Sequence, residues 1–338
     1  MKLVSYNSDN GFRSGLYVNE QVYDLAESAQ AIGLSLPESM LALLNLEEAG
    51  MQQARLVQAA IEGGEIQTAV PAAELVAPVP NPTSCRDAYA FRQHVATARM
   101  NRGVAMIPEF DEYPIFYFTN HNAIYGAGDI LIEDDHLHQL DFELEAAIIV
   151  GKGGKNISAN QADQYIAGYT IMNDFSARLL QMEEMKLNLG PAKGKDFATS
   201  IGPWLVTPDD LESHALPGPD GNRYDLRMQA FHNGELVSDG NMKDMNWSFA
   251  EILERASYGT EIYPGDVIGS GTVGTGCFLE LNGTAALEAK ERRTNFTPTW
   301  LKDRDVMELR IEGLGSLRNR IVHSGEHHSI LAKKKQLE

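Results

Sequence analysis

The strongest candidate for chemistry is an acid-rich segment near the middle of the chain. Its three carboxylates, Asp141, Glu143 and Glu145, alternate with two apolar residues before an apolar run that ends at position 150. Because strand side chains alternate between two faces, the three acids would share one face of a largely buried strand. Buried carboxylates repel one another unless a cation lies among them, and hard divalent ions accept such oxygens directly. The segment indicates either a metal site or the solvent-facing half of an edge strand.

Two more acids and a histidine lie where a metal ligand or a base could be placed. Asp174 stands where an apolar strand pattern meets the start of a helical pattern, and a helix N-cap is its alternative role. Asp87 and His94 are seven residues apart, so they would share a face if the whole segment is helical. The alternative is a capped surface helix with a solvated His94. Spacing alone leaves both interpretations open.

The glycine-rich stretch 269–276 raises the question of a nucleotide site. A dinucleotide-binding turn must open a helix. Residues 277–281 read Cys-Phe-Leu-Glu-Leu, and this alternation predicts a strand that leads into a turn. We therefore expect no nucleotide site at this position.

Composition excludes several classes of function. The 338 residues include 28 Lys and Arg against 47 Asp and Glu, a formal net charge of −19, which argues against nucleic acid as a partner. No apolar run approaches the roughly 20 residues that a membrane span requires. The two cysteines form neither a CxxC pair nor a disulfide framework, which favours a reducing compartment. We expect a soluble, cytoplasmic protein without a membrane partner.

The elements that must position these residues fall into two groups. Short strands at 3–6, 15–18 and 21–25 and two short helices within 37–61 predict a small N-terminal domain over residues 1–75. Four prolines between positions 71 and 82 indicate an extended connector, and we place the second domain at 76–338. This domain has an α+β, β-rich pattern. We expect its strands at 115–118, 130–132, 140–150, 165–172, 204–206, 226–232, 266–268, 277–281 and 306–311, and its helices at 88–102, 176–185 and 249–258. The lysine-rich end at 333–336 is expected to be solvated.

Taken together, four ordered motifs resemble the fumarylacetoacetate hydrolase family. They are residues 141–150, 172–178, 189–204 and 269–272, and the resemblance spans about residues 84–290. The N-terminal segment is similar to the small domain of the longer family members. The resemblance implies a mixed β-sheet roll preceded by a small N-terminal α/β domain.

The resemblance also implies a divalent metal, Mg²⁺ or else Ca²⁺ or Mn²⁺. The family's ligand acids correspond here to Asp87, Glu143, Glu145 and Asp174. By the same comparison Asp141 is not a direct ligand. Residues of the family's metal shell match Lys195 and Thr199.

Further roles come from the same resemblance. The general base matches His94, and its orienting glutamate matches Glu280, expected on a Leu-Glu-Leu strand. Residues that stabilise an oxyanion match Lys195 and Gln181. Substrate contacts match Tyr89, Tyr117, Arg102 and Thr272, with Arg102 only approximately placed. Met185 and Ala198 depart from the family pattern, which indicates an altered rim.

The function implied is metal-dependent hydrolysis of a C–C bond in a small β-diketo acid of the fumarylacetoacetate or acylpyruvate type, as in aromatic amino acid and tyrosine catabolism. The alternative within the family is a decarboxylase, hydratase or tautomerase of a small 2-oxo acid with the same metal site. A non-enzymatic calcium-binding scaffold is the hypothesis from another class. The family resemblance further implies a homodimer.

Overall fold

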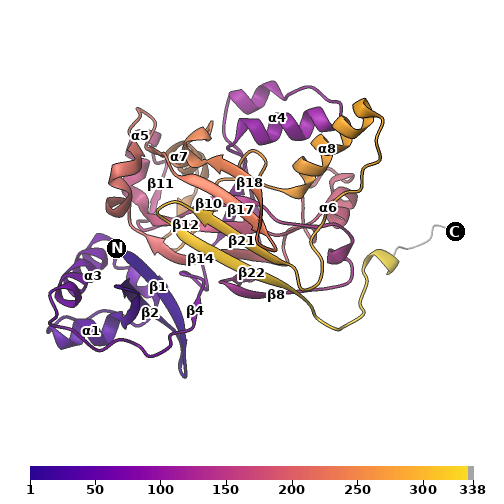
Figure 1. The fold of residues 1–338 in the computed structure, drawn as a ribbon. Helices are drawn as coiled ribbons and strands as arrows, with labels where there is room; N and C mark the ends of the chain where they lie inside the picture. The colour runs from indigo at the N-terminus through magenta and orange to yellow at the C-terminus, as the bar shows by residue number, and fades with distance from the viewer. Residues whose placement is uncertain (334–338) are drawn as a thin grey trace.

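Two stacked β-sheets form the centre of the computed structural model, which describes residues 1–333 (Figure 1). Within these residues the larger sheet has eleven strands. Its path runs through β3 (Gln21–Asp24), β2 (Gly11–Val18), β1 (Lys2–Ser8), β14 (Thr199–Val206), β12 (Ile166–Asp174), β10 (Leu144–Val150), β20 (Val267–Gly269), β5 (Cys85–Ala88) and β6 (Phe116–Thr119). Off this path, β4 (Leu75–Val76) pairs with β1 and β7 (Ile124–Tyr125) pairs with β14.

The smaller sheet has five strands in the same part of the chain. Its order is β18 (Glu235–Asn241), β17 (Arg227–His232), β21 (Val306–Ile311), β22 (Gly315–His323) and β8 (Gly128–Ile132). Three two-stranded pairs complete the β structure: β9 (Leu140–Asp141) with β13 (Ser176–Ala177), β11 (Gly154–Lys155) with β19 (Glu261–Ile262), and β15 (Ala215–Leu216) with β16 (Arg223–Tyr224).

Helices flank these sheets. The α-helices are α1 (Leu25–Ala31), α2 (Met40–Leu44), α3 (Glu47–Glu62), α4 (Arg92–Asn101), α5 (Ala159–Ala162), α6 (Arg178–Met185), α7 (Phe249–Ser257) and α8 (Phe278–Arg292). The 3₁₀ turns are η1 (Pro108–Asp111), η2 (His136–Gln139), η3 (Asp163–Tyr165), η4 (Pro208–His214), η5 (Met242–Asp244) and η6 (Leu331–Lys333). Residues 334–338, with most of the lysine-rich end, lie outside the described residues. In residues 1–333 no helix is long and apolar enough to span a membrane.

Strand β10 is buried along its whole length because both faces of the large sheet are covered at this point. Ile148 packs into the core between the two sheets, whereas Ile149 packs into the core beneath the N-terminal helices. A strand covered on both faces reads as a near-continuous apolar run, which is the pattern at 146–150. The β-rich α+β class and the mixed β-sheet fold predicted from the sequence are therefore confirmed.

The N-terminal strands extend the large sheet, because β1 pairs antiparallel with β14. Helix α1 was not predicted. It begins after Asp24, whose carboxylate accepts the backbone N–H of Glu27 as an N-cap. Two short helices were expected within residues 37–61, and the length expected for the second is wrong, because helix α3 has 16 residues. The assignment of residues 1–75 and 76–338 to separate domains stays a prediction.

Three further expectations about local structure are wrong, and each concerns the candidate site. Residues 141–150 do not form one strand, because the ladder breaks at positions 142–143, between β9 and β10. The helix expected from residue 88 begins only at Arg92, and Asp87 lies on β5 instead. The strand expected at 277–281 is the first turn of helix α8.

Candidate active site

A cavity of about 480 Å³ opens where α4, α6 and α8 meet the large sheet. Nine residues singled out from the sequence line it: Asp87, Tyr89, His94, Arg102, Tyr117, Glu143, Gln181, Lys195 and Thr272. The other four, Glu145, Asp174, Thr199 and Glu280, are buried. The topology thus gathers side chains from five strands, three helices and the loops between them, up to about two hundred positions apart in the chain.

Three carboxylates converge at one side of the cavity. Asp87, Glu143 and Glu145 each offer an oxygen, and these three oxygens lie within 4.8 Å of one another. Asp87 on β5 and Glu145 on β10 flank the strand β20, which pairs with both. A Cβ on Gly269 of β20 would lie 2.7 Å from Asp87 Oδ1 and 2.9 Å from Glu145 Oε2. The absence of a side chain at Gly269 therefore allows the two carboxylates to approach.

The electrostatics of this acid cluster, Asp87, Glu143 and Glu145, are unfavourable without a cation. Burial and the charge of Asp174 raise the pKa of Asp87 to about 7. Burial and the neighbouring charges of Asp87 and Glu143 raise the pKa of Glu145 well above its ordinary value. Within residues 1–333, Glu145 Oε2 and Asp174 Oδ1 are buried without a hydrogen-bond partner. These unpartnered oxygens fit a hard divalent cation such as Mg²⁺ or Ca²⁺, which prefers oxygen ligands.

Asp174 is linked to the acid cluster through Lys195. The Lys195 ammonium donates to Glu143 Oε2 and, at 2.9 Å, to Asp174 Oδ2. Asp174 lies on β12 opposite Thr199 of β14, so the prediction that Thr199 lies near these acids agrees with the register. Asp174 is therefore a strand residue whose side chain faces the site, and the N-cap role does not apply to it.

Two cations hold Glu143 in its ionised form. Arg178 Nη2 donates to Glu143 Oε1 at 2.8 Å, and Lys195 bonds the other oxygen. Burial alone would raise the pKa of Glu143, but the charges of Lys195 and Arg178 more than offset this and lower it to about 2. Burial likewise opposes the charge on Lys195, yet Asp174 and Glu143 raise its pKa. Both side chains stay charged at neutral pH.

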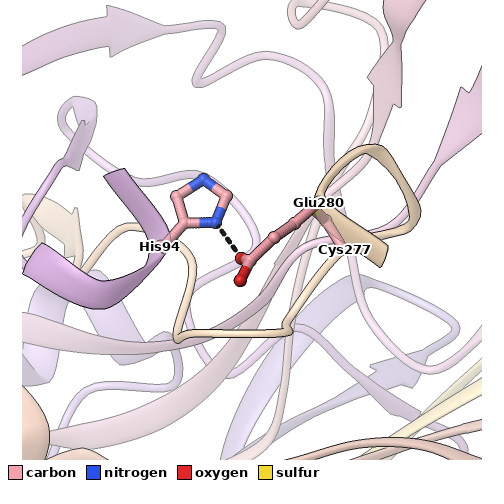
Figure 2. Close-up of side chains that lie close together, drawn as sticks. All are labelled: His94, Cys277 and Glu280. Carbon is pink, nitrogen blue, oxygen red and sulfur yellow. Dashed lines mark hydrogen bonds and ion pairs between the residues drawn. The ribbon is translucent and has the colours of Figure 1, made fainter. Parts of the chain in front are cut away.

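His94 and Glu280 form a buried dyad between α4 and α8. Figure 2 shows the imidazole Nδ1 facing the Glu280 carboxylate, and the distance from Nδ1 to Oε2 is 2.6 Å. The second ring nitrogen points away from Glu280 (Figure 2). A carboxylate at Nδ1 holds the proton there, which leaves Nε2 able to accept one. The dyad therefore has the arrangement of an oriented general base.

Asp141 positions the helix that carries Glu280. Its carboxylate accepts the backbone N–H of Phe278 at 2.7 Å and of Leu279 at 2.9 Å, which are amides at the start of α8. Its Oδ2 also accepts Arg178 Nε at 2.8 Å. A capping acid stabilises the N-terminus of a helix. Asp141 thus caps α8 and pairs with Arg178; its exclusion from the metal ligands stays a prediction from the resemblance.

The hydrogen bonds that Asp141 accepts at the start of α8 also bear on whether the glycine-rich stretch 269–276 forms a nucleotide site. A helix does follow the glycine-rich stretch, so the reason given for excluding a nucleotide was wrong. The first amides of this helix are nonetheless taken by Asp141 and are not free for a phosphate. One glycine of the stretch serves the acid cluster instead, because the N–H of Gly271 donates to Asp87 Oδ1 at 3.1 Å.

Sequence reasoning missed the role of Arg178. This residue is 2% exposed and joins Asp141 to Glu143, so it connects the capped helix with the acid cluster. An arginine four residues after the end of a buried strand is a signal that could have been used, because a buried guanidinium needs carboxylate partners. The motif that ends at Arg178 was noted, but no role was assigned to the arginine.

The remaining predicted residues surround the acid cluster and the dyad. Tyr117 pairs with Asp87 across β5 and β6, and its hydroxyl donates to Asp174 Oδ2. The Thr272 hydroxyl donates to Glu145 Oε1 at 3.5 Å. The rings of Tyr89 and His94 have centroids 6.0 Å apart. These contacts place Tyr117 and Thr272 against the acids and Tyr89 beside His94.

Gln181 and Arg102 lie on the helical side of the cavity. Gln181 Oε1 accepts Arg178 Nη1 at 3.0 Å, which leaves the amide N–H groups of Gln181 for another partner. Arg102 stands at the C-terminal end of α4, where its Nε donates to the carbonyl of Ala98 at 3.1 Å. Met182 and Met185 of α6 add apolar surface to the same wall.

Comparison with known proteins gives consistent matches. Residues 83–322 match the family described as "Fumarylacetoacetate (FAA) hydrolase C-terminal". Oxaloacetate tautomerase YisK of Bacillus subtilis is 29% identical over 266 residues, 77% of this chain and 77% of that protein. A fumarylacetoacetase of Arabidopsis thaliana is 35% identical over 246 residues, 60% of this chain and 57% of that protein. A solved fumarylacetoacetate hydrolase from Exiguobacterium antarcticum has a TM-score of 0.65 at 23% identity, covering 96% of this chain and 99% of that one.

The family match covers residues 83–322, which contain both the acid cluster and the dyad. The solved structure shares the fold over nearly the whole chain, including the N-terminal strands and helices. The sequence match and the shared fold therefore lead to the same conclusion, that the chain belongs to the fumarylacetoacetate hydrolase family of enzymes.

Proposed function

We propose that this protein is a divalent-metal-dependent hydrolase that cleaves a carbon–carbon bond of a β-diketo acid of the fumarylacetoacetate or acylpyruvate type. The observation that carries the proposal is the His94–Glu280 dyad, because His94 lines the same cavity as Lys195 and as Asp87 and Glu143 of the acid cluster. Hydrolysis needs an activated water beside a stabilised enolate, and this cavity brings together groups suited to both.

The acids would hold the cation. We propose Asp87, Glu143, Glu145 and Asp174 as its ligands, with Lys195 and Thr199 beside them. When bound, a divalent cation supplies positive charge that binds the two oxygens of a 1,3-dicarbonyl and stabilises the enolate leaving group. Gly269 and the Gly271 amide keep Asp87 in place for this role.

The protein side chains would carry the proton transfers. His94 Nε2 takes a proton from water, and the resulting hydroxide attacks the substrate carbonyl. Glu280 stabilises the imidazolium that forms. The carbon–carbon bond then breaks, one fragment leaves as an enolate that takes up a proton, and the other becomes a carboxylic acid. Each step uses a group whose ordinary chemistry at neutral pH is suited to it.

Other residues would orient the substrate. The Gln181 amide and the Lys195 ammonium are donors suited to the oxyanion of the tetrahedral intermediate. Tyr89, Tyr117 and Thr272 are proposed as contacts to the diketo acid, and Arg102 as the partner of a second carboxylate. The apolar side chains of Met182 and Met185 would select the acyl end.

The second candidate is a tautomerase of a small 2-oxo acid such as oxaloacetate. The relative of Bacillus subtilis that bears this name covers 77% of this chain, more than the fumarylacetoacetase does. Tautomerisation needs an enolate and a proton donor or acceptor but no attacking water. The same acids and His94 would suffice for it.

One set of assays separates the two candidates. Wild type is tested against acylpyruvates, fumarylacetoacetate and the enol of oxaloacetate, with Mg²⁺, Mn²⁺ or Ca²⁺ and with a chelator. We expect metal-dependent cleavage of at least one diketo acid and a loss on the order of 10²–10⁴-fold in His94→Ala. The matched control is His214→Ala. His214 lies on η4 and contacts the Asp225 carbonyl.

The proposal is wrong if His94→Ala keeps full hydrolysis of every diketo acid that wild type cleaves. Ketonisation of oxaloacetate without cleavage of any diketo acid would replace it with the tautomerase. Cytoplasmic location remains a prediction from composition, and a homodimer and a place in aromatic amino acid catabolism remain predictions from the family.

A further inference from the structure

A second cluster of potential metal ligands lies outside the cavity, where β8 and β22 end. These strands pair in parallel, with His323 opposite Ile132. Asp134 follows β8 by two residues, and His327 follows β22 by four. One ligand atom each from Asp134, His323 and His327 lies within 4.8 Å of the other two. Strand pairing therefore brings together residues that are almost two hundred positions apart.

The three side chains already contact one another through the carboxylate. His323 Nε2 lies 2.8 Å from Asp134 Oδ1, and His327 Nδ1 lies 3.2 Å from Asp134 Oδ2. The two imidazole rings have centroids 5.8 Å apart. Asp134 thus lies between two ring nitrogens that both face it.

The segment that carries His327 is anchored on both sides. Before it, the Ser324 hydroxyl donates to Glu133 Oε2 at 3.0 Å. After it, the Ser329 hydroxyl and the Ile330 N–H donate to the two carboxylate oxygens of Asp135, each at 2.7 Å. His327 is therefore positioned before any ligand arrives, which lowers the entropy that binding must remove.

The chemistry of this trio differs from that of the acid cluster in the cavity. Two imidazoles and one carboxylate are ligands typical of first-row transition ions, and Zn²⁺ with three protein ligands keeps a fourth position for water. Mg²⁺ and Ca²⁺ prefer all-oxygen sites. The side chains of Asp134 and His327 are 35% and 82% exposed, so an ion has access from solvent.

We propose that Asp134, His323 and His327 form a second metal site, selective for a transition ion such as Zn²⁺ and separate from the acid cluster. Binding requires a change at His323, because the Gly325 N–H donates to its Nδ1 at 3.2 Å in the structure. A ring that binds an ion through Nε2 carries its proton on Nδ1, so this hydrogen bond is given up. An ion held here fastens the segment after β22 to the end of β8.

The experiment uses chelator-treated, full-length protein in saturating Mg²⁺, so that the acid cluster is occupied by a hard ion. Zn²⁺ is then titrated by calorimetry, and its position is located by anomalous scattering at the zinc edge. We expect one Zn²⁺ equivalent at the trio. His327→Ala removes a direct ligand, so the affinity for Zn²⁺ should fall by more than the roughly 10–100-fold that is typical of changes behind the ligands.

The matched control is His121→Ala, an exposed histidine elsewhere on the surface, which should bind Zn²⁺ as wild type does. His327 is itself highly exposed, so its variant should fold, and thermal melting without zinc checks this. The proposal is overturned if wild type takes up no zinc at the trio, or if His323→Ala and His327→Ala bind it as tightly as wild type. Neither result depends on the proposed hydrolase activity.

Discussion

Two buried charge clusters in this molecule differ in how their charges are balanced. In the N-terminal region Asp24 accepts the Tyr6 hydroxyl and Arg13 Nε, each at 2.6 Å, as well as the Glu27 N–H. Each of these three donors therefore bonds an oxygen of the Asp24 carboxylate. In the cavity, by contrast, Glu145 and Asp174 each keep a buried oxygen without a partner among the described residues.

The pKa values express the same difference. Burial opposes ionisation of Asp24, but the bonds from Arg13, Glu27 and Tyr6 outweigh it and lower its pKa. At Glu145, burial and like charges act in the same direction and raise the pKa. A balanced cluster stabilises the fold, whereas an excess of buried negative charge reduces stability unless a cation binds. This excess of buried negative charge distinguishes the candidate active site from the N-terminal cluster.

The largest expected effect comes from removing one of the uncompensated charges. Glu145→Gln should lower catalytic efficiency on the order of 10³-fold, because the cation that would stabilise the enolate loses a carboxylate ligand and would be held less tightly. Without metal and above the ordinary pKa of glutamate, the same variant should be more stable than wild type by about 1–3 kcal/mol, because folding no longer has to bury Glu145 as a charge beside Asp87 and Glu143 or to protonate it. Urea unfolding in the presence of a chelator measures this.

The matched comparison is Asp24→Asn, which should lose stability under the same conditions. If metal-free Glu145→Gln is less stable than wild type, the acids do not repel one another and the contrast between the two clusters is wrong.

The next effect tests the balanced part of the active site. Arg178→Met removes the partner of both Asp141 and Glu143 and leaves two buried carboxylates with fewer bonds. We expect a loss of about 3–5 kcal/mol in the free energy of unfolding, since breaking a buried pair leaves an uncompensated charge. Denaturant titration measures it, and Arg92→Met, at an exposed pair with Asp111, is the control. A loss of stability below about 1 kcal/mol, which is the range for exposed ion pairs, would contradict this expectation.

The smallest effect concerns the N-terminal cluster and its dependence on pH. Because the pKa of Asp24 is lowered in the folded state, its stabilisation is present above its ordinary pKa and is lost as pH falls through the folded value. Burial and the bond to Asp24 raise the pKa of Tyr6 from 10.0 to about 12, so its contribution is present below pH 10 and is lost as pH rises toward 12.

Asp24→Asn should therefore reduce stability by about 2 kcal/mol at neutral pH, with activity unchanged, and the difference from wild type should shrink in acid. The difference in stability between Tyr6→Phe and wild type should disappear only in alkali. Thermal melts across pH check both variants. A difference that stays constant across this pH range would show that ionisation of these groups does not couple to folding.

Much of the site followed from local patterns and motif order. The spacing of Asp141, Glu143 and Glu145 indicated a possible metal site, and the structure does bring Glu143 and Glu145 together with Asp87. The apolar run at 146–150 is a buried strand, as predicted. The family followed from four motifs in order, and the match over residues 83–322 confirms it.

Other features could not follow from local patterns. The alternation at 277–281 predicted a strand, but the carboxylate of Asp141, more than a hundred residues earlier, caps a helix there. Asp87 and His94 would have shared a helix face only if the segment between them were helical throughout, yet Asp87 lies on β5 and His94 on α4. Local propensity is a weak signal, and contacts from distant segments override it.

By itself, then, the amino-acid sequence determined the β-rich class, the family and the residue types available for chemistry. The tertiary structure decided which carboxylates converge beside the cavity, which acid caps a helix and which histidine has a glutamate behind it. The physical reason is that charge balance depends on distance through space and on burial, and both are set by the pairing of strands far apart in the chain. The same holds for Asp134, His323 and His327, which only the parallel pairing of β8 and β22 brings together.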